Sequence, residues 1–247
     1  MPGQRLDQLL VERKHFETRA RARDAILRGT VTVDGKICFK PGQKTRDGAT
    51  VSVDDPAAGY VSRAALKLVA GLEAFQVNPA GRCCLDIGAS TGGFTQVLLG
   101  RGAHKVHAID VGHGQMHESI AGDPRVVMRE GLNARELTGD DLGGDRPDLI
   151  VSDVSFISLK LALPPALHLA APDAEGVFLV KPQFEAGRGH IGKGGLVDNV
   201  VAEDVARDLQ NWLNSVPGWS AGNLVPSPVS GGDGNREWLL HGKRQNR

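Results

Sequence analysis

The sequence has few cysteines, few aromatic side chains and no long hydrophobic run, although it is 247 residues long. Two of its three cysteines, Cys83 and Cys84, are adjacent, and such a set cannot form a disulfide framework or a spaced zinc site, so we expect no metal. No run approaches the roughly 18–20 apolar residues that span a bilayer. The first residues lack the apolar stretch of a secretory signal. These absences favour a soluble, cytoplasmic protein with reduced thiols.

Positive charge is concentrated near the beginning of the chain, although the formal net charge is zero. Residues 1–46 contain 11 Lys and Arg against 5 Asp and Glu, whereas residues 47–247 contain 18 against 24. A basic segment on an acidic body is typical of a protein that docks on a polyanion. The alternative is a solvated, arginine-rich helix face, and charge patterning alone leaves both open.

The first 58 residues have the pattern of a small α+β unit that ends in a linker. Apolar residues at helical spacing predict a helix over 6–11, and Thr18 is a suitable N-cap for a second helix that ends before Gly29. Alternating segments then predict strands at 31–33, 36–39 and 50–53, with Asp34-Gly35 as a hairpin turn. Residues 54–59 are typical of a linker.

Residues 59–247 alternate between strand and helix patterns. We expect helices over 62–75, 95–99 and 200–212 and strands over 83–87, 106–109, 126–128, 149–152, 176–180 and 238–240. Repeated β–α units predict an α/β, Rossmann-like, doubly wound and mostly parallel sheet. In such a sheet the chemistry lies at the carboxyl ends of the strands.

A glycine-rich turn, Gly88–Gly93, follows the first strand of this sheet. The turn is neither a dinucleotide fingerprint nor a phosphate loop, because no lysine follows its glycines. Asp110 ends the next strand, where a carboxylate can accept hydrogen bonds from ribose hydroxyls. This combination favours S-adenosyl-L-methionine over NAD. The alternative is a tight turn beside a structural carboxylate.

Charged residues also stand at the ends of later strands. Asp153 follows the strand over 149–152, and Lys181 follows the strand over 176–180. We expect the two side chains to face one cleft, although a lone lysine at such a position is more often a salt-bridge partner than a catalyst. Lys67 in the first helix and Glu237 before the last strand add two further charges.

Six segments stand in the order typical of a known enzyme family: SRAALKL, DIGASTGGFTQ, AID, SDVSF, VKPQFE and NREWLL. Together they resemble the FtsJ-like RNA ribose methyltransferases, and KPQFE narrows the resemblance to the TlyA-type (haemolysin A) ribosomal RNA methyltransferases. The first unit resembles an S4 RNA-binding domain. The resemblance covers nearly the whole chain. It implies a ribose 2′-O-methyltransferase that acts on a cytidine in ribosomal RNA of the small subunit, the large subunit or both.

The resemblance also implies the site residues. It implies a catalytic tetrad of Lys67, Asp153, Lys181 and Glu237, in which Lys181 is the candidate general base, Asp153 orients it and Glu237 holds Lys67. Thr91 departs from the family, in which many members have proline at this position. The implied cofactor, S-adenosyl-L-methionine, would be held by Asp86, Gly88, Ser90, Gly92, Gly93, Phe94, Asp110 and Asn133.

The basic residues of the first unit are candidates for phosphate contacts, which supply affinity but little sequence information. We expect such contacts from Arg5, Arg19, Arg21, Arg23, Arg28, Lys36 and Lys40. Three other classes stay open at this point: a haemolysin, a non-catalytic RNA-binding protein, and a methyltransferase that acts on a base nitrogen or a protein. The sequence offers no amphipathic pore segment for the first of these.

Overall fold

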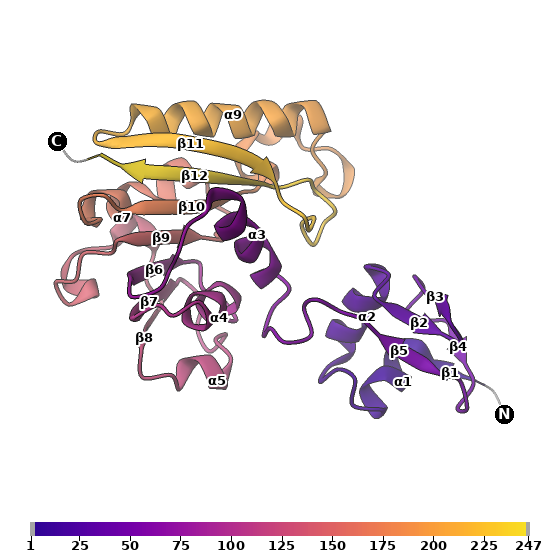
Figure 1. The fold of residues 1–247 in the computed structure, drawn as a ribbon. Helices are drawn as coiled ribbons and strands as arrows, with labels where there is room; N and C mark the ends of the chain where they lie inside the picture. Colours follow the sequence, from indigo (N-terminus) through magenta and orange to yellow (C-terminus); the bar gives the residue numbers. More distant parts are fainter. Residues whose placement is uncertain (1–2, 246–247) are drawn as a thin grey trace. The chain divides into compact units, whose positions relative to one another are not determined.

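The computed structural model describes residues 3–245, and these divide into two compact units. The first unit ends at Gly59 and the second begins at Tyr60, whereas the sequence predicts a boundary between residues 58 and 59. Each unit has its own hydrophobic core, so each is described by itself (Figure 1).

In the first unit two helices pack against a small antiparallel sheet. The helices are α1 (Leu6–Glu12) and α2 (Arg19–Leu27), and Thr18 caps α2 because its hydroxyl accepts the Arg21 N–H at 3.3 Å. The sheet has the order β3-β2-β5, from β2 (Val31–Val33), β3 (Lys36–Ile37) and β5 (Val51–Val53). A separate pair joins β1 (Gln4–Arg5) to β4 (Lys44–Thr45).

The hairpin between β2 and β3 turns at Asp34 and Gly35, which have positive φ angles of 49° and 77°. Two successive positive φ angles characterise the turn that matches the twist of a two-residue hairpin. Helix and sheet then meet in a core that includes Leu6, Leu10, Ile26 and Val31. This packing confirms the small α+β unit predicted from the sequence.

The second unit is built on a seven-stranded sheet in the order β11-β12-β10-β9-β6-β7-β8. Its strands from β8 to β10 are parallel, and β12 runs antiparallel to both of its neighbours. The bounds are β6 (Cys83–Ile87), β7 (Lys105–Asp110), β8 (Val126–Glu130), β9 (Leu149–Ser152), β10 (Glu175–Val180), β11 (Trp219–Pro226) and β12 (Trp238–Arg244).

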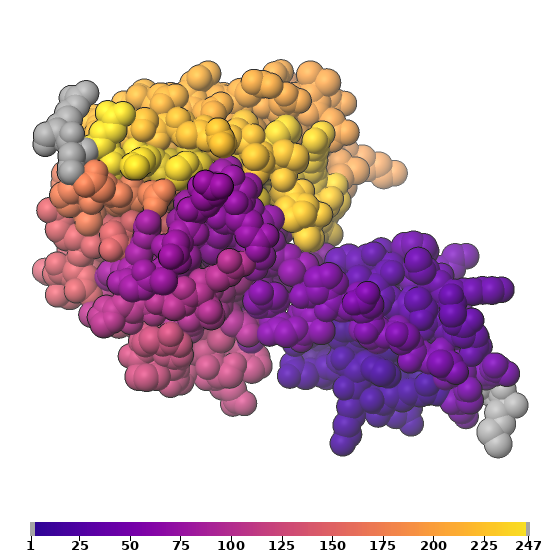
Figure 2. Space-filling view, viewed as in Figure 1, coloured from indigo at the N-terminus to yellow at the C-terminus, as the bar shows by residue number. Residues whose placement is uncertain are grey.

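Successive residues of the central strands face opposite sides of the sheet, and helices cover both faces. In β10, Val177 and Leu179 pack into one core, whereas Phe178 and Val180 pack into the other. The first core includes α3 (Ala65–Phe75) and α4 (Gly93–Gly100). The second includes α6 (Leu159–Ala162), α7 (Pro164–Leu169) and α9 (Asn199–Ser215). In Figure 2 the yellow C-terminal strands lie between the orange atoms of α9 and the purple atoms of α3.

The order of the strands reverses between β6 and β9. The chain proceeds from β6 through β7 to β8 on one side, and β9 and β10 follow on the other side. In doubly wound sheets ligands bind outside the carboxyl ends of the strands at this reversal. The predicted fold class is therefore confirmed, with the two short helices α5 (Glu118–Ala121) and α8 (Pro182–Glu185) completing the unit.

Within residues 3–245, no helix is both long enough and apolar enough to span a membrane.

Candidate active site

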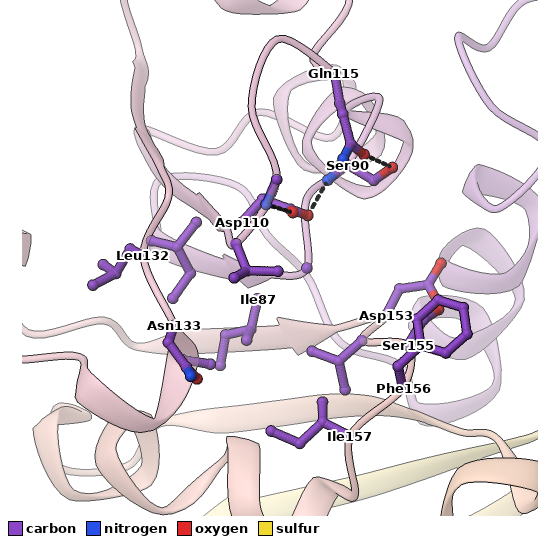
Figure 3. A pocket seen from close by; sticks show the side chains of 16 residues that line it. Ile87, Ser90, Asp110, Gln115, Leu132, Asn133, Asp153, Ser155, Phe156 and Ile157 are labelled. Atoms are coloured by element: carbon purple, nitrogen blue, oxygen red, sulfur yellow. Dashed lines mark hydrogen bonds between the residues drawn. The ribbon is translucent and has the colours of Figure 1, made fainter.

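A cavity of about 500 Å³ opens at the carboxyl ends of β6, β7 and β9. This volume lies in the range of about 300–1,000 Å³ that small-molecule sites occupy. Figure 3 shows Ser90 and Asp110 on one side of the cavity and Asp153, Ser155 and Phe156 across from them. We call it the nucleoside cavity.

The glycine turn between β6 and α4 forms one wall of the nucleoside cavity. Gly88 has a φ of +82°, and a Cβ atom there would lie 3.0 Å from the backbone oxygen of Asp153. Glycine is therefore required both by the backbone angle and by the closeness of the loop after β9. Thr91, the departure from the family pattern, lies in this turn and is exposed.

The carboxylate of Asp110 lies at the end of β7 and lines the cavity. Its Oδ2 accepts the Ser90 N–H at 2.8 Å, and its Oδ1 accepts the Gly112 N–H at 2.7 Å. These bonds fix the carboxylate, and each of its oxygens keeps a further lone pair. Asp110 can thus accept hydrogen bonds from the hydroxyls of a ribose placed in the cavity.

Apolar side chains from three loops complete the nucleoside cavity. They are Val111 after β7, Leu132 after β8 and Ile157 after β9. The resemblance implied the loop over residues 131–135 near the adenine, which includes Leu132, whereas Val111 and Ile157 were not expected from the sequence. Asn133, which the resemblance implied, also lines the cavity, and its Oδ1 accepts the Arg135 N–H at 3.1 Å. An apolar wall beside polar groups is what a purine ring and its ribose need.

Four of the residues implied as cofactor ligands lie behind the cavity wall. Asp86 is fully buried, and its Oδ2 accepts the Thr95 hydroxyl at 2.7 Å. Burial raises the pKa of Asp86 to about 7. Phe94 packs in the core beneath α3, and a Cβ on Gly93 would lie 2.9 Å from the Cβ of Ser62. Together with Gly92, whose φ is +91°, these residues shape the turn from behind.

A second cavity, of about 440 Å³, adjoins the nucleoside cavity. The two share Ser155 and Phe156, and the second is lined further by Lys67, Lys181 and Glu237. Phe156 is 91% exposed and has a φ of +65°. We call this second space the acceptor cavity.

Two ion pairs bring the four implied catalytic residues together around these cavities. Lys181 Nζ lies 2.6 Å from Asp153 Oδ1 and donates to Ser155 Oγ at 2.8 Å. Lys67 Nζ lies 2.5 Å from Glu237 Oε2, and their side chains are only 7% and 2% exposed. Burial raises the pKa of Glu237, whereas the positive charges of Lys67 and Lys181 oppose that rise.

One cluster of potential metal ligands lies among the described residues, and the sequence analysis did not foresee it. Donor atoms of Cys83, His107 and Asp145 lie within 4.8 Å of one another. However, Asp145 Oδ2 is already 2.9 Å from Lys105 Nζ and 2.8 Å from His107 Nε2. Burial also raises the pKa of the Cys83 thiol to about 11. The Asp145 carboxylate is thus engaged in ion pairs, and burial favours the protonated form of the Cys83 thiol.

The basic residues of the first unit differ in whether their charge is already engaged in an ion pair. The guanidinium groups of Arg5 and Arg19 both contact Asp7, and the hydrogen bond from Arg5 lowers the pKa of Asp7 to about 2. Arg28 forms a bidentate pair with Asp55 at 2.6 and 2.8 Å. Arg21 pairs with Glu17, and the side chains of Arg23, Lys36 and Lys40 are exposed.

Comparisons with known proteins identify both units. Residues 60–244 match the FtsJ-like methyltransferase family, and residues 4–51 match the S4 domain. A Mycobacterium tuberculosis protein named 16S/23S rRNA (cytidine-2′-O)-methyltransferase TlyA is 46% identical over 96% of this chain and 88% of its own. Hemolysin A of Brachyspira hyodysenteriae is 40% identical over 96% of this chain and 98% of its own.

A solved structure from Streptococcus thermophilus that carries a hemolysin name is also similar. It is 38% identical to this chain, with a TM-score of 0.77, and the match covers 100% of this chain and 90% of that one. The similarity thus extends over both units.

Proposed function

The chain belongs to the TlyA-type ribosomal RNA methyltransferases, in which an S4 domain precedes an FtsJ-like methyltransferase domain, and we propose that it methylates the 2′-hydroxyl of a cytidine in ribosomal RNA. The name of the M. tuberculosis relative includes both 16S and 23S rRNA. The acceptor is therefore proposed in the small subunit, the large subunit or both. With this substrate, the enzyme is proposed to act in the cytoplasm.

The residues of the nucleoside cavity fit S-adenosyl-L-methionine. Asp110 offers carboxylate oxygens to ribose hydroxyls, and Val111, Leu132 and Ile157 offer an apolar surface to the adenine. Gly88 leaves open the space that a Cβ atom would fill. When bound, S-adenosyl-L-methionine supplies an electrophilic methyl group carried by a sulfonium.

Lys181 is proposed to remove the proton from the attacking hydroxyl. The bond between the hydroxyl oxygen and the methyl carbon would form as the methyl–sulfur bond breaks, and the electron pair of that bond would remain on sulfur. The hydroxyl proton would pass to Lys181 Nζ, which must be the neutral amine at that moment. Asp153, 2.6 Å away, stabilises the ammonium that forms. Ser155 Oγ, at 2.8 Å, holds Nζ at the boundary between the two cavities. A proton acceptor fixed at that boundary contributes to the rate through orientation as well as basicity.

Lys67 and Glu237 are proposed to shape the acceptor cavity. Both side chains are buried, and each neutralises the charge of the other. The two residues come from distant parts of the chain, because α3 carries Lys67 and Glu237 directly precedes β12.

The observation that supports this reaction most directly is the position of the Lys181–Asp153 pair. Asp153 lines the nucleoside cavity and Lys181 lines the acceptor cavity, yet the two side chains are in contact. Methyl transfer needs such a junction, because donor and acceptor must be held on either side of one reacting bond.

The RNA is proposed to bind in part through the first unit. Its exposed cations Arg23, Lys36 and Lys40 can contact phosphates, whereas Arg28 is occupied by Asp55. Phosphate contacts of this kind position the protein on RNA, and shape and 2′-hydroxyls guide recognition.

The proposal is tested by incubation of the purified chain with labelled S-adenosyl-L-methionine and with each ribosomal subunit. Nuclease digestion followed by mass spectrometry then identifies the modified residue and separates ribose from base methylation. We expect label in a 2′-O-methylcytidine. Label in a base or in a ribosomal protein would overturn the proposal, as would a chain that lyses erythrocytes but leaves the RNA unmethylated.

A further inference from the structure

Glu185 makes two hydrogen bonds across the edge of the active site. It is the last residue of α8, the short helix that begins directly after Lys181. Its Oε2 accepts the Ser158 hydroxyl at 2.6 Å, and its Oε1 accepts the Leu159 N–H at 2.7 Å. Ser158 is in turn the N-cap of α6, because its Oγ accepts the Lys160 N–H at 3.1 Å.

These bonds connect the two segments that carry the reacting groups. Residues 153–158 form the loop after β9, and they supply Asp153, Ser155 and Phe156 to the two cavities. Residues 181–185 follow β10 and supply Lys181. In a parallel sheet the ends of neighbouring strands meet at one edge, but the loops beyond them have no ladder hydrogen bonds to fix their register.

Three contacts fix that register instead, and they occur in the same order along both segments. Lys181 contacts Asp153 and Ser155, the ring of Phe184 lies 5.1 Å from that of Phe156, and Glu185 binds Ser158 and Leu159. Glu185 is the member of this series with two hydrogen bonds to the far end of the loop.

The loop needs such a constraint because part of it is strained. Phe156 adopts a φ of +65°, a backbone conformation that is unfavourable for a residue with a side chain. Strain of this kind persists only where neighbouring contacts hold the backbone on both sides. Asp153 is held on one side by Lys181, and Ser158 is held on the other by Glu185.

The position of Glu185 is unfavourable for a charged carboxylate. Burial raises the pKa of Glu185, while the hydrogen bonds from Ser158 and Leu159 oppose the rise. Lys160 favours the charged form and Asp208 disfavours it. A carboxylate suits this position because its two oxygens can accept both hydrogen bonds at once.

We propose that Glu185 is a positioning residue for methyl transfer, because it holds the loop of Asp153 and Ser155 in register with Lys181. The inference rests on the proposed function, since it assigns a second residue to the same reaction. Glu185 lines neither cavity, so it acts indirectly, by keeping Lys181 at a fixed distance from Asp153 and Ser155.

The test compares steady-state kinetics on ribosomal subunits for the intact chain and for Glu185→Ala. A displacement of about 1 Å at the reacting groups costs about 100-fold in rate, so we expect kcat to fall by about 10- to 100-fold while KM for the subunit changes little. Glu185→Gln keeps an oxygen for the Leu159 N–H and an amide that can donate to Ser158 Oγ, and it should recover most of the loss. Glu203→Ala is the matched control, because Glu203 pairs with Arg207 on the outer face of α9.

A second measurement keeps the inference testable if Glu185→Ala does not fold. Ser158→Ala removes one of the two bonds to Glu185, together with the cap that accepts the Lys160 N–H, and leaves the carboxylate in place. We expect a smaller loss of kcat than in Glu185→Ala. We also expect faster amide exchange at Leu159 in Glu185→Ala but not in Ser158→Ala or Glu185→Gln, which keep an acceptor for the Leu159 N–H.

The outcomes separate the two proposals. If the wild-type chain methylates the subunits and both folded variants keep its kcat, the positioning role is wrong and the proposed function stands. If the wild-type chain leaves the subunits unmethylated, the proposed function fails whatever the variants do. A loss that appears in KM alone would also overturn the positioning role, because it would indicate substrate binding.

Discussion

Lys181 Nζ lies 2.6 Å from Asp153 Oδ1, and this contact joins the two cavities of the methyltransferase unit. The contact follows from the sheet, because β9 and β10 are parallel neighbours and each residue stands directly after its strand. The reacting groups are thus carried by the most buried part of the fold, which gives them a fixed separation.

Replacement of Lys181 by alanine should remove the proton acceptor and keep the cofactor site. We expect kcat on ribosomal subunits to fall by about 100- to 10,000-fold, the usual contribution of a general base. The affinity for S-adenosyl-L-methionine, measured by calorimetry, should change little because Lys181 does not line the nucleoside cavity. Lys105→Ala is the control, since Lys105 pairs with Asp145 at the other end of the sheet. Near-normal turnover in Lys181→Ala would exclude Lys181 as the base.

Most of the sheet could be predicted from the sequence because the central strands are short apolar runs bounded by turns. The strands over 83–87 and 149–152 have the predicted bounds. The strand β11 was missed, because Gly222, Asn223 and Pro226 interrupt its pattern and its pairing shifts register between Ala221 and Leu224.

The site was predictable only where the chemistry is carried by a motif. The residues Lys67, Asp153, Lys181 and Glu237 were named from their motifs, and the fold brings them to two adjoining cavities. Apolar lining residues such as Val111 and Ile157 come from separate loops and leave no local pattern. A motif also does not reveal whether its residues are buried, and Asp86 is fully buried. Nor does it reveal long-range ion pairs, such as the pair between Arg28 and Asp55, 27 residues away.

The buried pair of Lys67 and Glu237 allows stability and catalysis to be separated. Removal of one partner leaves an uncompensated buried charge, so Lys67→Met alone should lower the free energy of unfolding by about 3–5 kcal/mol. The double variant Lys67→Met/Glu237→Gln should recover much of that loss in urea denaturation, because no lone charge remains buried. Its methyl transfer should stay impaired. A double variant with full activity would reduce the pair to a structural role.

Gly88 and Gly81 provide a matched pair of glycine substitutions. Both have positive φ angles, +82° and +75°, so alanine at either position costs roughly 1–2 kcal/mol in backbone energy. A Cβ at Gly88 also meets the backbone of Asp153 at 3.0 Å, whereas nothing lies within 4 Å of one at Gly81. We expect Gly88→Ala to lose at least about tenfold in affinity for S-adenosyl-L-methionine, and Gly81→Ala to keep it. Equal affinities would show that the turn adapts.

The buried Asp86 should make the stability of the methyltransferase unit depend on pH. Its pKa is about 7 in the fold, whereas that of an exposed aspartate is 3.8, so the folded state binds the proton more tightly. The free energy of unfolding contributed by this group is therefore greatest below about pH 4 and falls as pH rises towards 7. Charges on Asp153 and Asp110 favour the protonated form, and the Thr95 hydroxyl favours the charged form.

Urea denaturation at pH 5 and pH 8 measures this contribution. Asp86→Asn should show a smaller loss of stability between the two pH values than the wild-type chain, because it cannot ionise. The difference between the two chains cancels the titration of other groups. A variant with the same pH dependence as the wild type would mean that Asp86 is charged throughout this range.

The exposed cations of the first unit, here called the S4 unit, should determine how strongly RNA affinity depends on salt. Each lost phosphate contact lowers the slope of log affinity against log salt by roughly 0.7–0.9. The triple variant Arg23→Ala/Lys36→Ala/Lys40→Ala should therefore bind ribosomal subunits more weakly and with a flatter salt dependence, while its affinity for S-adenosyl-L-methionine is kept.

Arg28→Ala is the informative contrast, because it removes the same charge from the same unit. Arg28 is only 18% exposed and its guanidinium is bidentate on Asp55, so its loss leaves the Asp55 carboxylate, 3% exposed, without its partner. We expect this variant to lower the urea midpoint of the S4 unit and to leave the salt slope nearly unchanged. If Arg28→Ala instead flattened the slope as much as the exposed cations do, the Asp55 pair would have to open on RNA, and the division between structural and RNA-contacting arginines would be wrong.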